Sequence, residues 1–257
     1  MEGNNQLTLL MNRDNWGNRV ISKASWDGHI LSGRCENSNC TWLAISKRGR
    51  VAFLMSRTLV DDDIVPFRGC EFYPSQFLES NMSPWEFAVD VQRERDIQNK
   101  WSYSLIVADM ASNSMVHIRK PEKDEPNVMI GFVPSGVHTL SPVHGLDSAI
   151  SERDIHLRDR FTQMIGHLGN DPLPQLREFA SNFMFSPVGE GQETVFVDEM
   201  ANHPDLQLAL GMQRYGTTST TALVVKRTGE VKIFERYWEE NGQWTENNLP
   251  DFTFQDN

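Results

Sequence analysis

The distribution of apolar and polar positions predicts antiparallel β-sheet in the first half of the chain. Apolar runs are separated by short polar segments rich in turn-forming residues. The paired runs are residues 41–46 with 51–55, 101–109 with 115–119, and 128–133 with 137–140. In the first pair the loop contains Gly49, which adopts a positive φ at little cost. Three successive hairpins favour an antiparallel sheet over βαβ units.

Start signals and helical periodicity predict three helices. Ser83, Pro84 and Glu86 form a capping-box start for a helix that closes near residues 94–96. A second helix opens at residues 151–154, and residues 169–172 stop it. A third helix is expected from Pro174 to about Phe185. The apolar positions that we assign to the core are Leu157, Phe161, Met164, Ile165 and Leu168 on the second helix, and Leu176, Phe179, Ala180 and Phe183 on the third.

Strand signals return in the C-terminal part of the chain. A short strand is expected at residues 194–197, and a long one ends at residue 226 before a turn at Thr228-Gly229. Residues 231–237 are expected to form the strand that follows this turn. Phe252 and Phe254 lie on one face of an expected last strand. Two stacked antiparallel sheets with helices on their outer faces would bury these runs, although other α+β arrangements satisfy the same pattern. We expect a single domain over residues 1–257.

Charge and composition narrow the classes of partner. The 257 residues carry 35 acidic and 24 basic side chains, a formal net charge of −11. This field repels polyanions, so we expect no nucleic-acid partner. No apolar run approaches the roughly 18–20 residues of a membrane span, so we expect no transmembrane segment. The first residues resemble neither a signal peptide nor a transit peptide, and the expected compartment is the cytoplasm.

Candidate chemistry is sparse. Cys35, Cys40 and Cys70 are an odd number, which fits a reducing compartment and argues against a disulfide framework. Cys35 and Cys40 lack a second cysteine pair, and residues 61–63 are expected to be a solvated acidic loop, so we expect no metal site. The sequence contains no phosphate-binding glycine loop, zinc-protease motif or nucleophile elbow. His138 and His144 are interpreted as ordinary loop or strand histidines.

The stretch Asn12-Arg13-Asp14-Asn15 is the strongest candidate site. It follows the apolar run 7–11, and a strand that ends in a charged pair would direct Arg13 and Asp14 into a cleft at its end. A surface ion pair, or a turn that starts at Asp14, explains the same residues.

Five motifs in order give this stretch a context. They are Asn-Arg-Asp at 12–14, residues 41–46 with 48–53, residues 104–109, residues 214–217 with 219–223, and Glu-Arg-Tyr at 235–237. Over nearly its whole length the chain resembles the transport and Golgi organisation 2 family, also called the NRDE family. The resemblance implies a four-layer αββα fold of the N-terminal-nucleophile hydrolase type.

The chain departs from the family pattern at the positions where catalysis would be expected. The family typically begins Met-Cys, and the exposed cysteine would attack an amide, whereas this chain has Glu2. Asn15 stands where the family usually has Glu. Pro142 stands where it usually has Asn, and Thr218 stands where it usually has Arg. Arg13 and Asp14 remain. We therefore expect no catalytic residues and no enzymatic activity.

The resemblance implies a non-catalytic protein of haem trafficking or of lipid and acyl-CoA handling, with roles in Golgi organisation and protein secretion. The ligand-binding candidates are Arg13, Asp14, Asn12 and Thr218. No cofactor is required, and haem or acyl-CoA would be a transported ligand whose propionate, carboxylate or phosphate pairs with Arg13. The alternatives are an N-terminal-nucleophile amidohydrolase, which the missing cysteine disfavours, and a scaffold in secretory organisation. The family is associated with the cytosol, the Golgi and the mitochondrion.

Overall fold

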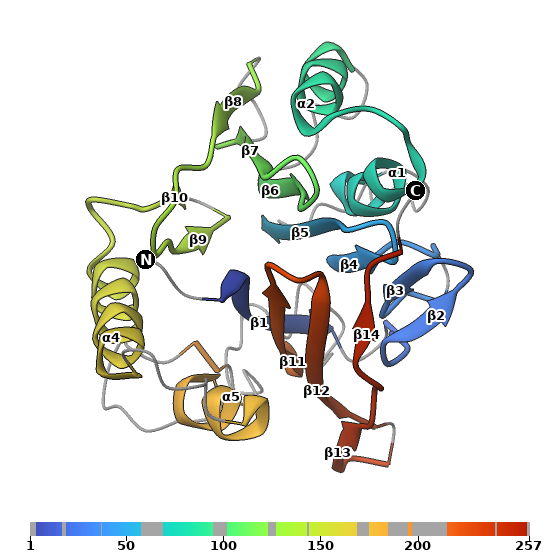
Figure 1. The fold of residues 1–257 in the computed structure, drawn as a ribbon, viewed down its shortest axis with the longest axis vertical. Helices are drawn as coiled ribbons and strands as arrows, with labels where there is room; N and C mark the ends of the chain where they lie inside the picture. The colour runs from blue at the N-terminus through green and yellow to red at the C-terminus, as the bar shows by residue number, and fades with distance from the viewer. Residues whose placement is uncertain are drawn as a thin grey trace, which may run out of the picture. The chain divides into compact units, whose positions relative to one another are not determined.

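A computed structural model describes residues 4–16, 19–36, 38–57, 69–94, 102–122, 127–142, 144–168, 175–184, 195–196, 215–239 and 241–255. The chain forms two compact units. Unit 1 comprises residues 1–24 and 165–254, and unit 2 comprises residues 25–164 and 255–257. Each unit is built on one antiparallel sheet, so the predicted α+β class with two antiparallel sheets and helices is confirmed (Figure 1). The prediction of a single domain over residues 1–257 stays a prediction.

The sheet of unit 1 joins the two ends of the chain. Its strands are β1 (Asn5–Trp16), β11 (Tyr215–Lys226), β12 (Glu230–Trp238), β13 (Trp244–Asn247) and β14 (Phe252–Thr253). The order is β1-β11-β12-β13, and β14 pairs with the start of β12. Helix α5 (Leu176–Met184) packs on β1, β11 and β12 through Phe179, Ala180, Phe183 and Met184. The long β1–β11 ladder therefore joins the N-terminal strand to the C-terminal strands of this unit.

The sheet of unit 2 has seven strands in sequence order. They are β2 (Ser25–Asp27), β3 (Ile30–Ser32), β4 (Leu43–Ser46), β5 (Arg50–Arg57), β6 (Ser102–Asp109), β7 (Ser114–Lys120) and β8 (Met129–Phe132). The helical segments η1 (Cys70–Phe72), α1 (Tyr73–Glu79) and α2 (Pro84–Arg93) connect β5 to β6, and α1 and α2 pack on the sheet (Figure 1). Tyr73, Phe77 and Leu78 of α1 are fully buried there. Helix α4 (Glu152–Leu168) follows the short pair β9 (Leu140–Ser141) and β10 (Gly145–Leu146).

Most of the predicted local elements are confirmed. The hairpins β4–β5, β6–β7 and β11–β12 have the expected partners, and Gly49 has a φ of 79°. Ser83 and Glu86 form both bonds of the capping box, and the Ser151 hydroxyl accepts from the Asp154 amide at the start of α4. Phe252 and Phe254 lie together, with ring centroids 6.3 Å apart.

Two predictions about strands are wrong. The third hairpin does not form, because β8 pairs with β7 and Leu140 pairs with Leu146 of β10. Between them a side-chain bond from His138 to the Pro134 carbonyl closes an irregular loop. Second, the strand that contains residues 7–11 does not end in the charged pair Arg13-Asp14, because its ladder with β11 continues to Trp16.

Other elements carried no recognised signal, or lie partly outside the described residues. The sequence predicted none of β2, β3, η1, α1, β10 and β13. Within the expected strand 194–197 only Val195 and Phe196 are described, and they are not in a strand. The expected loop at 61–63 and the helix stop at 169–172 lie outside the described residues.

Candidate functional site

The stretch Asn12-Arg13-Asp14-Asn15 lies within β1, opposite the N-terminal half of β11. Asn12 is opposite Thr220, Arg13 opposite Ser219, and Asp14 opposite Thr217. The register shifts between Arg13 and Asp14, so that β11 inserts one extra residue, Thr218, at this point. Such a β-bulge re-aims side chains and is frequent beside functional sites. All four predicted ligand-binding residues are thus brought together on one pair of strands.

The Asn12 side chain is fully engaged by the fold. Its amide nitrogen donates to the carbonyls of Met184, at the end of α5, and Val195, at 3.2 and 3.0 Å. Its oxygen accepts from the Thr220 hydroxyl at 2.6 Å. A side-chain amide has two N–H donors, and both have acceptors here. Asn12 therefore joins β1, β11 and the end of α5, and its polar atoms already have protein partners.

Asp14 and Thr218 are held by the same ladder. The Thr217 hydroxyl donates to Asp14 Oδ1 at 2.7 Å, which fixes the carboxylate against β11. The Thr218 hydroxyl donates to the Arg13 backbone carbonyl at 3.3 Å. At the bulge, the hydroxyls of two successive threonines of β11 therefore bond to β1. Thr217 bonds to the side chain of Asp14, and Thr218 bonds to the backbone of Arg13. Both bonds fix the position of the Arg13-Asp14 pair on the strand.

Strand alternation separates the candidates into two groups. Successive side chains of a strand point to opposite faces of the sheet, so Asn12 and Asp14 share the face on which Asn12 meets α5. Arg13 points to the other face, together with Met11 and Asn15, which are both buried. Asn15 Nδ2 donates to the Arg19 carbonyl at 2.7 Å and holds the chain that leaves β1. The half-buried Arg13 is thus the charged group of the stretch on that face.

The Glu-Arg-Tyr motif at 235–237 is part of the same sheet. Glu235 on β12 is buried, and its Oε2 accepts from the Ala24 amide and from Asn247 Nδ2, each at 2.8 Å. Asn247 Nδ2 also donates to the Ala24 carbonyl at 2.7 Å. Arg236 lies over the Trp244 ring, 4.6 Å from its centroid. The bonds of Glu235 and Asn247 to Ala24 hold the segment that follows β1. The motif therefore has a structural role.

The three cysteines are buried thiols of unit 2. Cys40 Sγ donates to Glu71 Oε2 at 3.1 Å. Burial, with the Glu71 charge second, raises the pKa of the Cys70 thiol well above its usual value. A nucleophilic cysteine needs access and a lowered pKa. Cys70 has the opposite environment.

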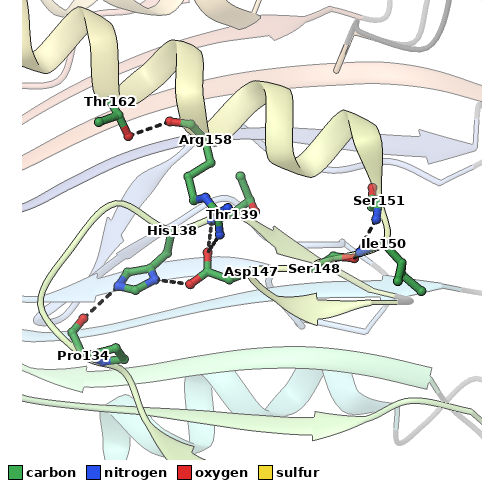
Figure 2. Close-up of polar contacts among 9 residues, drawn as sticks. All are labelled: Pro134, His138, Thr139, Asp147, Ser148, Ile150, Ser151, Arg158 and Thr162. Atoms are coloured by element: carbon green, nitrogen blue, oxygen red, sulfur yellow. Dashed lines mark hydrogen bonds and ion pairs between the residues drawn. The ribbon is translucent and has the colours of Figure 1, made fainter.

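A separate polar cluster surrounds Asp147 in unit 2 (Figure 2). His138 Nδ1 lies 2.5 Å from Asp147 Oδ2, and His138 Nε2 lies 2.8 Å from the Pro134 carbonyl oxygen. The Thr139 amide donates to Asp147 Oδ1 at 3.0 Å, and Arg158 of α4 is 3.7 Å from the same oxygen. Both ring nitrogens of His138 are thus engaged by oxygen atoms of the same loop. The cluster closes the 134–147 loop and joins it to α4.

Sequence reasoning interpreted His138 as an ordinary histidine and did not consider Asp147 or Arg158. Asp147 has a φ of 52°, a left-handed conformation in which aspartate and asparagine are enriched. His138 and Asp147 are nine residues apart and belong to no regular element, so no periodicity connects them. Only the Gly-Leu-Asp turn composition after His144 gives a weak signal.

His117 is a half-buried histidine on β7 of unit 2. It alternates with Val116 and Ile118, which are fully buried. Its Nε2 is buried, and no hydrogen-bond partner for it is present among the described residues. Burial, with the positive charge of Arg119 second and the opposing charge of Asp147 third, lowers the pKa of His117 to about 4. His117 is therefore neutral at physiological pH.

Within the described ranges, no group of three or more His, Cys, Asp or Glu side chains is arranged to hold a metal ion. No helix in the same ranges is long and apolar enough to cross a membrane.

The profile of the family described as "Transport and Golgi organisation 2" matches residues 1–240. No curated protein matches the sequence. Among solved structures, the chain is similar to a mutant of the conjugated bile acid hydrolase from Clostridium perfringens, with 9% sequence identity and a TM-score of 0.46. That alignment covers 97% of this chain and 88% of the hydrolase.

Proposed function

Because the chain belongs to the transport and Golgi organisation 2 family, we propose that it is a non-catalytic carrier of an apolar ligand that bears an anionic group. Haem and acyl-CoA are the two ligands of this chemistry that the family resemblance suggests. The protein would act in haem trafficking or lipid handling, at the Golgi or the mitochondrion, and thereby support secretion. The observation that carries the proposal is Arg13, whose backbone is fixed at the β11 bulge and whose side chain points to the face opposite Asn12 and Asp14.

Arg13 is the group that would bind the ligand. A guanidinium pairs with carboxylate or phosphate through two parallel hydrogen bonds, and this geometry is specific. The Thr218 bond to the Arg13 carbonyl and the Thr217 bond to Asp14 hold the backbone on both sides of the bulge. A fixed backbone reduces the entropy lost on binding. Asn12 would support this arrangement from the α5 face without contacting the ligand.

The chemistry of the cysteines supports a carrier over an amidohydrolase. Residue 2 is Glu, where the family has a cysteine. Cys35, Cys40 and Cys70 are buried, and the raised pKa of Cys70 keeps that thiol protonated. Thr218 stands where the family has an arginine and Pro142 where it has an asparagine, so two candidate contacts for a polarised carbonyl are also missing.

An optical titration of the purified protein with haem tests the proposal. We expect a saturable, stoichiometric shift of the haem absorption band, and we expect Arg13→Ala to weaken binding by at least about tenfold, since a charge-assisted pair contributes roughly 1.5–3 kcal/mol. Arg227→Ala is the matched control, because Arg227 is an exposed arginine beyond the other end of β11. Long-chain acyl-CoA is then added as a competitor.

The outcomes separate the alternatives. If neither Arg13→Ala nor Arg227→Ala changes the affinity for the ligand, the ligand binds elsewhere on the protein. An absence of saturable binding of both haem and acyl-CoA would contradict the carrier and favour the scaffold.

A further inference from the structure

Two of the three cysteines of unit 2 face each other across a short turn. The Cys35 amide donates to the Cys40 carbonyl at 3.0 Å, and the Asn39 amide donates to the Cys35 carbonyl at 2.7 Å. Asn39 has a φ of 55°. This is the pattern of a β-bulge whose first residue is left-handed, so that Asn39 and Cys40 together oppose Cys35. Cys35 and Cys40 therefore form a hydrogen-bonded pair at the base of the turn.

The spacing of this pair suits a disulfide. Opposed residues of an antiparallel hydrogen-bonded pair have Cα atoms about 5.5 Å apart, and their side chains lie on the same face. A disulfide requires Cα atoms roughly 4.4–6.8 Å apart. Cys35 and Cys40 are 2% and 1% exposed, so both thiols lie on the buried side of the turn. The backbone therefore holds the two side chains at a separation that a disulfide can bridge.

The Cys40 thiol is held by polar groups. Its Sγ donates to Glu71 Oε2 at 3.1 Å and lies 2.7 Å from the Ser38 hydroxyl. A carboxylate that accepts the S–H bond is positioned to take the proton when the sulfur attacks. Cys70 is fully buried, and the backbone bond between its segment and the turn joins Thr41 to Glu71, so it pairs no two cysteines. Cys35 is therefore the partner that the backbone geometry selects for Cys40.

We propose that Cys35 and Cys40 form a reversible disulfide by exchange with a small oxidised disulfide such as oxidised glutathione. This inference concerns unit 2 and does not depend on the carrier function. The Cys40 thiolate attacks one sulfur of the reagent, so that a mixed disulfide forms and one glutathione leaves as a thiolate. The Cys35 thiolate then attacks the Cys40 sulfur and releases the second glutathione. The protein loses two electrons and two protons, and the reagent gains them as two molecules of reduced glutathione.

The reaction begins with a local opening of the turn. Glu36 and Asn39 near its tip are exposed, whereas Cys40 directly after them is buried. A contact of the tip, from Arg34 Nη1 to Asn39 Oδ1 at 3.2 Å, is also exposed. Exposed segments of this kind open at a lower cost in free energy than the core of the fold. In a reducing compartment, which the sequence predicts, such a disulfide is transient and redox-sensing.

Equilibration of the whole native chain with mixtures of reduced and oxidised glutathione tests the proposal. After free thiols are blocked with N-ethylmaleimide, trypsin releases residues 35–47 as one peptide, because Arg34 and Lys47 border it. Cys70 lies in a different peptide. We expect the free thiols to fall from three to one per molecule and the 35–47 peptide to lose two hydrogens. A bond that links the peptides of Cys40 and Cys70, or three free thiols at every glutathione ratio, would overturn the proposal.

Variants and the unfolded state distinguish a pair built by the fold from a chance encounter of thiols. Cys70→Ser is the matched control and should leave the disulfide unchanged, whereas Cys35→Ser should leave Cys40 as a mixed disulfide with glutathione. Because the native turn positions both thiols, we expect the equilibrium constant for oxidation to be at least about tenfold larger in the native than in the urea-unfolded protein. By linkage, oxidation then raises the urea midpoint of the wild type. An equal or smaller equilibrium constant in the native protein would contradict the inference without any variant.

Discussion

His117 predicts a specific dependence of stability on pH. Burial lowers its pKa to about 4 in the folded protein, whereas an unfolded chain gives a histidine its ordinary value near 6.5. The unfolded state therefore binds a proton at a pH where the folded state does not. The folded protein therefore loses stability as the pH falls from about 6.5 toward 4, and the effect of His117 is absent above pH 7.

The size of the effect follows from the two pKa values. Their difference corresponds to roughly 3 kcal/mol in the acid limit, and about 2 kcal/mol of this is lost between pH 7 and pH 5. His117→Phe keeps a ring of similar shape and removes the titration. We therefore expect the free energy of unfolding of the variant to fall by about 2 kcal/mol less than that of the wild type when the pH is lowered from 7 to 5.

Urea unfolding at a series of pH values, followed by far-UV circular dichroism, measures this difference. His156→Asn is the matched control, because His156 is exposed on α4. The control should follow the wild-type curve. If His117→Phe also follows the wild-type curve, burial does not suppress the charge of His117 and the reasoning fails.

Three further predictions concern stability and reactivity. Asn12→Ala leaves the Met184 and Val195 carbonyls without their donor, so we expect a loss of about 2–3 kcal/mol in urea unfolding, and a loss below about 0.5 kcal/mol would contradict the structural role. The raised pKa and burial of Cys70 should make its labelling by a thiol reagent at least about a hundredfold slower in the native than in the unfolded protein, and equal rates would refute this. Asp147→Asn should be more stable than Asp147→Ala by about 1 kcal/mol, because asparagine tolerates the φ of 52°, and the reverse order would refute the conformational argument.

The elements that could be predicted are those with local signals. The loop with Gly49 and the capping box of Ser83 and Glu86 lie within a few residues of the structures that they specify. The partner of a strand could not be predicted in this way. Residues 128–133 were expected to pair with residues 137–140, but they pair with β7, because a local alternation of apolar residues does not determine which strand lies beside it.

The candidate site shows the same division. The motif order identified Arg13, Asp14 and Thr218, yet the ladder that joins them links residues more than two hundred positions apart, and it carries a bulge. The sequence grouped Asn12 with Arg13 as ligand-binding candidates. Strand alternation places these two side chains on opposite faces, and the bonds of Asn12 to Met184 and Val195 involve backbone carbonyls that no sequence pattern marks.

The most direct test of the central claim is equilibrium dialysis of the protein against palmitoyl-CoA, followed by mass spectrometry of the retained ligand. A non-catalytic carrier retains the ligand in a stoichiometric, saturable amount and returns it intact, and Arg13→Ala reduces the retained amount while Arg227→Ala does not. Release of coenzyme A by the wild-type protein would contradict the claim, because it would show that the chain cleaves what it binds. Failure to retain palmitoyl-CoA, together with failure to bind haem, would contradict it as well, because neither proposed ligand would then be carried.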